Sequence, residues 1–310
     1  MKVDKSEIPV ALFVFNRHEQ LAKTLDCLRK NGLPKLYVFA DGSRDKDDES
    51  DIKKVRAIID AIDWVNVEKS YQKKNKGLSK SIQDGLDYVF TNHDKAIVIE
   101  DDICVAPQFY SYMSACLNEY EDSREIGGVT GLRYPFYKKN LNSDPYDVFI
   151  APRFSSWGWG SWKRQWETLS FDGEALVKEL RACNVRLDAG GSDLPYAINE
   201  IESGNLSGYW DVSFYMNMLL HKQYFVWPKQ NFVINTGITE GSHASGAPEP
   251  PWQLRWENKN LTGGEWRLPK RIAENDKILK DFLNFFEPSN LIGTSLRQGV
   301  GQKLKRIKLR

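Results

Sequence analysis

The first hundred residues repeat one pattern, in which a short apolar run is followed by turn residues and then by a segment with apolar side chains at every third or fourth position. The apolar runs at residues 10–15 and 96–99 are continuous, without alternating polar residues. Such runs are typical of parallel strands that are covered on both faces, and the segments between them have the spacing of amphipathic helices. The sequence therefore predicts an α/β fold in which helices flank a largely buried sheet.

Further elements follow from the same periodicities. In the first hundred residues we predict strands at 10–15, 35–40, 64–67 and 96–99, with a helix after each of the first three. The charged segment 43–51 is interpreted as a solvated loop, and the Gly-, Pro- and Ser-rich segment 242–251 as another loop. The remaining predicted elements are helices at 109–120, 173–183 and 211–222 and strands at 127–131 and 224–227.

Composition narrows the class of protein. The 310 residues carry a net charge of +1 and are 41% hydrophobic, which excludes a disordered chain and a protein that binds nucleic acid with its whole surface. We therefore expect a small-molecule partner and no nucleic acid. The four cysteines lack the spacing of a zinc module or redox motif and indicate a reduced compartment. No signal peptide and no run of about 18 apolar residues is found, so we expect a cytoplasmic protein.

Aromatic residues gather in the second half of the chain. Nine of the ten tryptophans follow residue 150, and four of them lie within residues 157–166. Two interpretations stay open, because indole rings can pack on the apolar faces of sugar rings or can fill a hydrophobic core.

Three consecutive carboxylates, Glu100, Asp101 and Asp102, directly follow the apolar run at residues 96–99. Adjacent like charges at the end of a buried strand repel one another unless a cation or hydrogen-bond donors compensate them. Carboxylate oxygens suit Mg²⁺ or Mn²⁺, and such an ion suits a diphosphate leaving group. Strand alternation places Glu100 and Asp102 on one side and Asp101 on the other. The alternative is a plain acidic loop that opens a helix.

Three segments together resemble the nucleotide-sugar-dependent glycosyltransferases of the GT-A fold: VALFVFNR at residues 10–17, FADG at 39–42 and EDDICVAP at 100–107. The last is especially similar to the N-acetylglucosaminyltransferase I group, whose metal motif is likewise Glu-Asp-Asp followed by an apolar residue and Ala-Pro. The resemblance implies a GT-A type, Rossmann-like mixed sheet flanked by helices. Residues 1–106 would be the nucleotide-sugar-binding half, residues 107–250 the aromatic-rich acceptor-binding and catalytic half of the same domain, and residues 251–310 a C-terminal helical extension with a basic tail.

The same resemblance implies roles for individual residues. Asp102 would bind the metal ion, Mn²⁺ or Mg²⁺. The implied donor-binding residues are Asn16, Arg17, Asp41, Lys76, Glu100, Asp101, Trp157, Gly158, Trp159 and His243. Ordinary structural roles are alternatives for several of these: Arg17 could open a surface helix, the Asp-Gly pair at residues 41–42 could form a turn, Lys76 could precede a plain helix N-terminus, and a lone loop histidine is often only exposed.

Asp211 is the predicted catalytic residue. It follows Trp210, and the related enzymes place their catalytic aspartate after a tryptophan in a comparable stretch. A carboxylate here would accept the proton of the acceptor hydroxyl during inverting transfer. The alternative is that Asp211 only caps the helix at 211–222. In that case Glu240, Asp193 or Glu202 would serve as the base.

Together these features predict a metal-dependent glycosyltransferase that moves a sugar from a UDP-sugar such as UDP-GlcNAc to a hydroxyl of a glycan or lipid-linked oligosaccharide, with inversion. The absence of a signal anchor resembles bacterial enzymes of surface-polysaccharide synthesis. One alternative is a sugar nucleotidylyltransferase, although the Gly-rich basic loop typical of that class is replaced here by FNRHE at residues 15–19. The other is a carbohydrate-binding protein without catalysis, against which the three carboxylates argue.

The net charge of +1 is the sum of a basic C-terminal segment and an acidic remainder. Residues 297–310 contain six basic residues and no acidic one, so the remainder carries a net charge of −5. Apolar residues interleave with the basic ones, which predicts weak attraction to anionic lipid head groups and a peripheral position on the inner face of the plasma membrane. A disordered solubilising end is the alternative.

Overall fold

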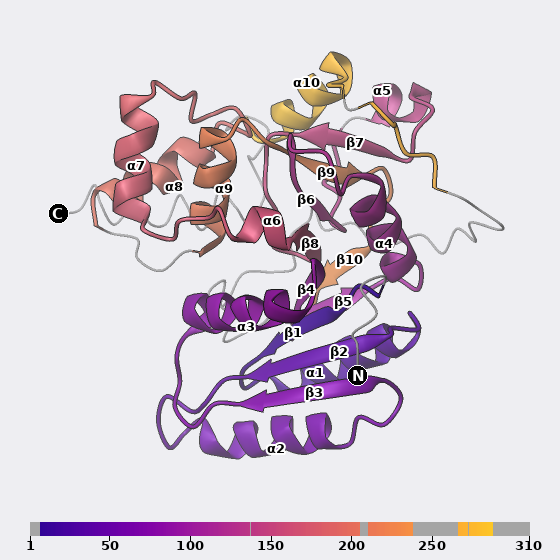
Figure 1. Cartoon of the computed structure of the whole chain (residues 1–310), viewed down its shortest axis with the longest axis vertical. Helices are drawn as coiled ribbons and strands as arrows, with labels where there is room; N and C mark the ends of the chain where they lie inside the picture. Colours follow the sequence, from indigo (N-terminus) through magenta and orange to yellow (C-terminus); the bar gives the residue numbers. More distant parts are fainter. Residues whose placement is uncertain (1–6, 137, 205–209, 238–265, 272, 288–310) are drawn as a thin grey trace.

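One eight-stranded sheet runs through the molecule, with helices on both of its faces (Figure 1). The computed structural model describes residues 7–136, 138–204, 210–237, 266–271 and 273–287. The strand order is β3-β2-β1-β4-β8-β6-β9-β7, with parallel and antiparallel neighbours. The prediction of a Rossmann-like mixed sheet flanked by helices is confirmed. The strands are β1 (Val10–Val14), β2 (Lys35–Ala40), β3 (Asn66–Tyr71), β4 (Lys95–Glu100), β5 (Ile103–Val105), β6 (Ile126–Thr130), β7 (Val148–Ala151), β8 (Trp159–Trp162), β9 (Tyr224–Pro228) and β10 (Val233–Asn235).

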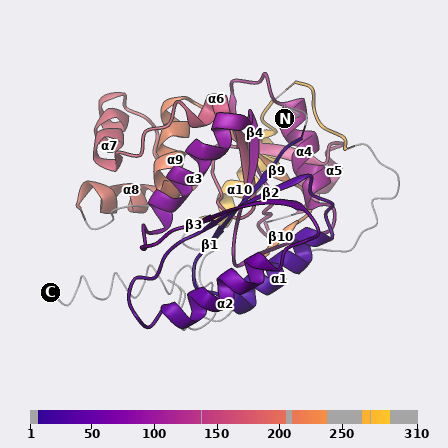
Figure 2. The ribbon, with the colours of Figure 1, turned by 60° about the horizontal axis from the view of Figure 1, so that its bottom comes forward.

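The first four strands form the parallel part of the sheet. β1 pairs with β2 on one side and with β4 on the other, and β3 pairs with β2. Helices α1 (His18–Arg29) and α2 (Glu49–Asp60) pack against each other on one face, and α3 (Leu78–Asn92) packs on β1, β2 and β4 from the other (Figures 1 and 2). Because these strands are parallel, the loops that follow β1, β2 and β4 meet at one edge of the sheet.

The second half of the chain extends the same sheet. β8 pairs antiparallel with both β4 and β6, β9 runs parallel to β6, and β7 runs antiparallel to β9. Outside the main sheet, β10 pairs antiparallel with β5, so that Asn235 lies opposite Ile103. The boundary at residue 106 remains a prediction, but hydrogen-bonded strands continue across it.

The remaining helices lie around the second half. The predicted helices at 109–120, 173–183 and 211–222 are present as α4, α7 and α9, and α10 forms a helix within the C-terminal extension. These helices are α4 (Phe109–Glu119), α5 (Lys138–Ser143), α6 (Lys163–Trp166), α7 (Gly173–Ala182), α8 (Leu194–Glu202), α9 (Trp210–Leu220) and α10 (Asp276–Phe285).

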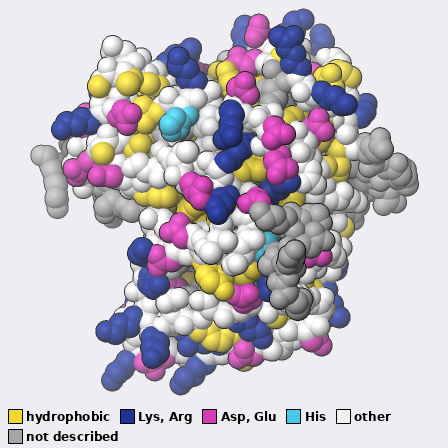
Figure 3. Space-filling view, in the orientation of Figure 1, with side chains coloured by type: hydrophobic (Ala, Val, Ile, Leu, Met, Phe, Trp, Pro, Cys, Tyr) yellow, Lys and Arg dark blue, Asp and Glu magenta, His cyan; other side chains and the backbone are white. Residues whose placement is uncertain are grey.

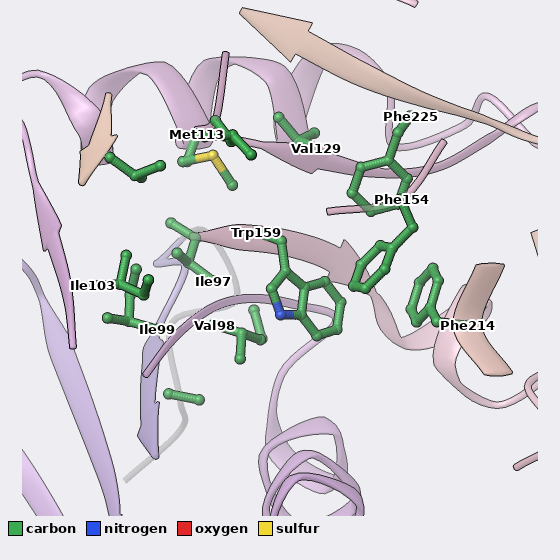
Figure 4. Packing of buried hydrophobic residues seen from close by; sticks show 14 of the residues in the cluster. Ile97, Val98, Ile99, Ile103, Met113, Val129, Phe154, Trp159, Phe214 and Phe225 are labelled. Carbon is green, nitrogen blue, oxygen red and sulfur yellow. The ribbon is translucent and has the colours of Figure 1, made fainter. Parts of the chain in front are cut away.

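Aromatic side chains fill the core of the second half. Trp159 of β8 packs against Phe154 and Phe214, with ring centroids 5.4 and 5.3 Å apart, and Figure 4 shows these rings together. Trp159, Trp162 and Trp227 are each at most 1% exposed. Of the two interpretations of the aromatic-rich half, core packing therefore applies to these three tryptophans.

Two expectations from the sequence are wrong in detail. The third strand spans Asn66–Tyr71 rather than 64–67. It is an edge strand with partly exposed polar side chains, so no apolar run marks its position in the sequence. The charged segment 43–51 is not simply a solvated loop, since Asp48 within it is only 5% exposed and α2 begins at Glu49. The strands β5, β7, β8 and β10 have three or four residues each, too few for a period to be recognised.

Acidic and basic side chains are interspersed over the face in Figure 3, in agreement with the small net charge. Among the described helices, none has the length and apolar character required to cross a membrane.

Candidate functional site

The carboxyl ends of β1 and β4 bring Arg17 to the three consecutive carboxylates. Phe13 of β1 lies opposite Glu100 of β4, so the loops that follow these strands are neighbours. A guanidinium nitrogen of Arg17 lies 2.5 Å from Asp102 Oδ2 and 3.8 Å from Asp101 Oδ1. Arg17 thus supplies part of the positive charge that adjacent carboxylates require.

Asp101 fixes the loop that carries Arg17. β4 ends at Glu100 and the next two residues form a turn, so the expected strand alternation of the three carboxylates is wrong beyond Glu100. The side chain of Asp101 accepts a hydrogen bond from the backbone N–H of Phe15 at 2.9 Å. Its backbone carbonyl accepts one from the hydroxyl of Thr24 in α1, also at 2.9 Å.

Asp102 is held from the other side by the segment after β10. The backbone N–H and the hydroxyl of Thr236 both donate to the Asp102 carbonyl, at 2.7 and 3.0 Å. Gly237 lies so close that a Cβ at this position would be 2.1 Å from Asp102 Oδ2. The antiparallel pairing of β10 with β5 therefore brings residues from the second half of the chain against the carboxylates.

Burial and mutual repulsion change the acidity of this cluster. Desolvation raises the pKa of Glu100 well above its ordinary value, and the negative charges of Asp102, Asp101 and Asp211 raise it further. Burial, followed by the charge of Asp102, raises the pKa of Asp101 to about 7. Burial also raises the pKa of Asp102, although Arg17 opposes this effect. An additional cation would relieve the repulsion.

The carboxylate oxygens of this cluster suit Mg²⁺ or Mn²⁺ as part of a coordination shell completed by other ligands. Carboxylate oxygens are hard ligands, and ions of this class often take one or two protein carboxylates together with phosphate oxygens and water. Within the described ranges, three or more His, Cys, Asp or Glu side chains are nowhere grouped as a complete metal cage. The cluster is therefore suited to an ion shared with a bound diphosphate.

Asp211 lies in the first turn of α9. α9 is described from Trp210, so Asp211 is the second of its described residues, and the N-cap of this helix lies outside the described part of the chain. Its Oδ1 accepts the backbone N–H of Val212 at 3.0 Å. Burial raises the pKa of Asp211, and its charge acts on the pKa of Glu100, so the two carboxyls are within electrostatic reach of each other.

Trp159 and Trp210 explain how α9 comes close to the strand that ends in Glu100. Trp159 lies opposite Val98, two residues before Glu100, so these three side chains share one face of the sheet. Figure 4 shows the indole of Trp159 beside Val98. The indole also stacks on Trp210, the residue before Asp211, with centroids 5.5 Å apart.

Several predicted donor-binding residues have structural partners instead. The amide of Asn16 donates to Asp48 Oδ1 at 2.8 Å. The carboxylate of Asp41 accepts the N–H groups of Lys76 and Gly77, at 2.9 and 3.0 Å, and so joins the end of β2 to the start of α3. The ammonium group of Lys76 pairs with Asp84 at 2.8 Å. No turn is assigned at residues 41–42, and the partners of Asp41 are these distant backbone N–H groups.

The tryptophan- and glycine-containing segment is packed into the protein. Trp159 is 1% exposed, and its indole N–H has no hydrogen-bond partner among the described residues. Gly158 has a φ of +59°, and a Cβ there would lie 2.7 Å from the side chain of Val233. The expectation that Gly158 and Trp159 line an open sugar pocket is therefore wrong, because both lie in the core, whereas Trp157 is only partly buried.

The alternative catalytic bases are Asp193, Glu202 and Glu240. The first two pair with arginines elsewhere, and Glu240 lies outside the described residues. Asp193 forms two hydrogen bonds of 2.9 Å with Arg153, and Glu202 pairs with Arg181 at 3.0 Å. His243, Glu240, the loop 242–251 and the basic tail 297–310 lie outside the described residues.

Sequence reasoning missed Thr24, whose hydroxyl supports the carboxylate turn. Thr24 is fully buried within the apolar stripe of α1, between Leu21 and Leu28. A hydroxyl residue within such a stripe is the signal that could have identified it, because a buried polar group requires a partner.

No family model matches the chain, and no curated protein does. Among solved structures, the chain is similar to the mannosyltransferase PcManGT from Pyrobaculum calidifontis, described in complex with GDP-Man and Mn²⁺. The similarity has a TM-score of 0.36 and 13% identity, and covers 63% of this chain and 52% of that one. The chain therefore spans about half the length of that structure. Roles for the residues of this site are argued from their own geometry.

Proposed function

We propose that the protein is a metal-dependent glycosyltransferase that moves a sugar from a nucleotide-sugar donor to a hydroxyl of a glycan or lipid-linked acceptor. The observation that carries this proposal is the meeting of Arg17 with Glu100, Asp101 and Asp102 at the ends of two adjacent parallel strands, with Asp211 nearby. Crevices at the carboxyl ends of parallel strands are where α/β sheets bind their ligands.

Asp102 and Glu100 are the side chains that would hold the divalent ion. When bound, the ion neutralises negative charge on the departing diphosphate. Arg17 adds a fixed positive charge next to the same position and orients Asp102 through their ion pair. Asp101 keeps Arg17 in place by holding the N–H of Phe15.

Asp211 is the proposed general base. Its carboxyl lies in the first turn of α9, and among the described residues it accepts hydrogen bonds only from the nearby backbone N–H groups of Asp211 and Val212. A carboxylate with two such partners keeps lone pairs for an acceptor hydroxyl. Burial raises its pKa toward the range in which a carboxylate is an effective base. A base on this side and a diphosphate held by the Arg17 cluster support transfer with inversion. The proposed donor, a UDP-sugar such as UDP-GlcNAc, rests on the sequence resemblance.

The deciding experiment is a panel of UDP- and GDP-sugars assayed for hydrolysis and transfer with Mn²⁺, with Mg²⁺ and with a chelator. We expect turnover of at least one donor that is lost on chelation. Asp102→Asn should lower metal affinity about 10- to 100-fold. Asp211→Asn should lower kcat about 100- to 10,000-fold and leave donor affinity unchanged.

Asp26→Asn is the matched control, since Asp26 is an exposed aspartate of α1 whose one ion-pair partner among the described residues is Lys30. Full transfer activity in Asp211→Asn, or retention of the donor's anomeric configuration, would remove the role of Asp211. Release of diphosphate from a nucleoside triphosphate and a sugar phosphate would instead identify a nucleotidylyltransferase. Metal-independent glycan binding without donor turnover would identify a carbohydrate-binding protein.

We also propose a bacterial, cytoplasmic enzyme that contacts anionic lipid through residues 297–310. Six basic residues in this segment support the proposal. Deletion of the segment should weaken sedimentation with phosphatidylglycerol vesicles, and unchanged sedimentation would exclude the membrane role.

A further inference from the structure

A cavity of about 370 Å³ lies between α3 and the strands β2 and β3. Its volume is within the range of small-molecule sites. Its lining reaches Asp41 and Lys76 at one end, but the described lining residues include neither Arg17 nor the carboxylates at 100–102. The cavity is therefore next to the candidate transfer site and not part of it.

The register of the sheet explains why this space exists. Tyr37 and Phe39 of β2 lie opposite Glu68 and Ser70 of β3, so these four side chains face α3 together. α3 approaches the inner strands closely at Gly85, where a Cβ would lie 2.6 Å from the ring of Phe13 and 3.1 Å from that of Phe39. The helix packs on β1, β2 and β4, and the row of side chains on β3 is left as a wall of the cavity.

The charges of the lining are already balanced. Glu68 accepts hydrogen bonds from Lys35 and from the Tyr88 hydroxyl. Asp84 is bound by the ammonium groups of both Lys76 and Lys80, at 2.8 and 2.5 Å. Lys69, the other lysine of the lining, lies 3.6 Å from Asp60. Each lysine among the described lining residues thus has a carboxylate partner, so a neutral ligand is favoured over a phosphate.

The lining also offers hydrogen-bonding groups and one exposed ring. The hydroxyl oxygen of Ser81 is buried without a hydrogen-bond partner among the described residues, which is unfavourable unless a ligand or water supplies one. Carboxylates that hold two partners keep further lone pairs for hydroxyl donors. The ring of Tyr88 is 48% exposed and stands at 77° to that of Tyr37.

We propose that this cavity binds one neutral sugar ring, as an accessory carbohydrate site separate from the site of transfer. The Tyr88 ring packs on the apolar face of the sugar, and Ser81 and Asp84 hydrogen-bond its hydroxyl groups. Tyr88 is the most exposed aromatic residue of the lining, whereas Phe39 packs beside Phe13 and Tyr37 with centroids 5.1 and 6.4 Å apart. This proposal does not depend on the proposed transferase activity.

The test is saturation-transfer NMR on the full chain with the methyl glycosides of glucose, galactose, mannose and N-acetylglucosamine as probes. We expect at least one glycoside to bind and UDP with Mn²⁺ not to displace it. Ser81→Ala should raise the Kd about 3- to 10-fold, and Ser81→Phe should abolish binding by filling the cavity. Thr91→Val is the matched control, because the Thr91 hydroxyl is on the same helix, is exposed and donates to the carbonyl of Asp87.

Each contrary result overturns the proposal. Absence of binding by all four glycosides removes the site, and wild-type affinity in folded Ser81→Ala protein removes its location. Displacement by UDP assigns the cavity to the donor site instead. If Ser81→Phe fails to fold by circular dichroism, Ser81→Ala decides. The transferase proposal fails in a different way: the wild-type protein would bind a glycoside but would not bind UDP.

Discussion

The guanidinium of Arg17, in the loop after β1, lies 2.5 Å from the carboxylate of Asp102, in the turn after β4. The two residues are 85 positions apart in the chain, and their strands are neighbours in the sheet. Arg17 also lies 3.8 Å from Asp101, and among the described residues it is the only cation that forms an ion pair with the carboxylates at 100–102. Arg17 therefore contributes to folding stability as well as to the proposed diphosphate site.

Replacement of Arg17 tests that contribution. Arg17→Ala leaves buried carboxylates without their cation and should lower the free energy of unfolding by about 1–3 kcal/mol, as measured by urea denaturation. Arg17→Lys should lose less, because the charge remains. Arg29→Ala, which removes an exposed arginine at the other end of α1, is the control. Equal stability of Arg17→Ala and the wild type would contradict the role.

Gly237→Ala should displace Asp102, because the added methyl group would overlap its carboxylate at 2.1 Å. We expect a loss of about 1–3 kcal/mol in unfolding free energy, measured by thermal denaturation. Gly127→Ala is the matched control, since the nearest atom to a Cβ there is 3.4 Å away. The prediction fails if both variants melt together.

The lowered pKa of Asp48 predicts a decrease in the free energy of unfolding at acidic pH. The hydrogen bond from Arg44 lowers its pKa to about 2 in the folded protein, below the value of about 3.9 expected for an unfolded chain. Its stabilisation is therefore complete above about pH 4 and is lost as the pH falls toward 2. Asp48→Asn should lower the unfolding free energy at neutral pH by about 1–2 kcal/mol, with a difference from the wild type that shrinks in that acidic window.

Asp47→Asn provides the comparison for Asp48, because Asp47 is the adjacent aspartate and is exposed. Its unfolding free energy should follow that of the wild type at every pH. A difference for Asp48→Asn that persists unchanged at pH 2 would show that the carboxylate charge is not the cause.

Cys27 should be the reactive thiol of α1. A hydrogen bond with Cys104 lowers the pKa of Cys27 to about 7, against the effect of burial. Because the thiolate is the nucleophile, alkylation of Cys27 by iodoacetamide should rise with a midpoint near pH 7, rather than the value of about 8.5 for a free thiol. Mass spectrometry of labelled peptides measures this, and Cys104→Ala should shift the midpoint upward. An unchanged midpoint in that variant would contradict the assignment.

The strands of the parallel part were predictable because each reads as an uninterrupted apolar run. β1, β2 and β4 are largely buried, and polar residues occur only at the ends of β2 and β4. β3, at the end of the sheet, is polar, and its predicted position is too early in the chain. β8 escaped prediction because its four residues include two buried tryptophans and a glycine, which from sequence are equally suited to a pocket.

The candidate site was predictable where the chain places residues next to one another. Glu100, Asp101 and Asp102 are consecutive, and the position of Arg17 follows from its place after a parallel strand. The roles of Asn16, Asp41 and Lys76 could not be read in this way, because their partners lie on other elements up to 36 residues away. Gly237 is a still more distant case, since only the pairing of β10 with β5 brings it to Asp102.

The pairing of β4 with β8 determines what a shortened gene product would do. In a fragment that ends at residue 106, β4 becomes an exposed edge strand whose backbone groups have lost their partners on β8, and five of its six residues are buried in the whole protein. An exposed edge strand of this kind pairs with strands of other chains. The first half carries most of the proposed donor-binding residues, yet it is expected to aggregate when expressed alone, so donor binding should be measurable only in a chain that also contains β8.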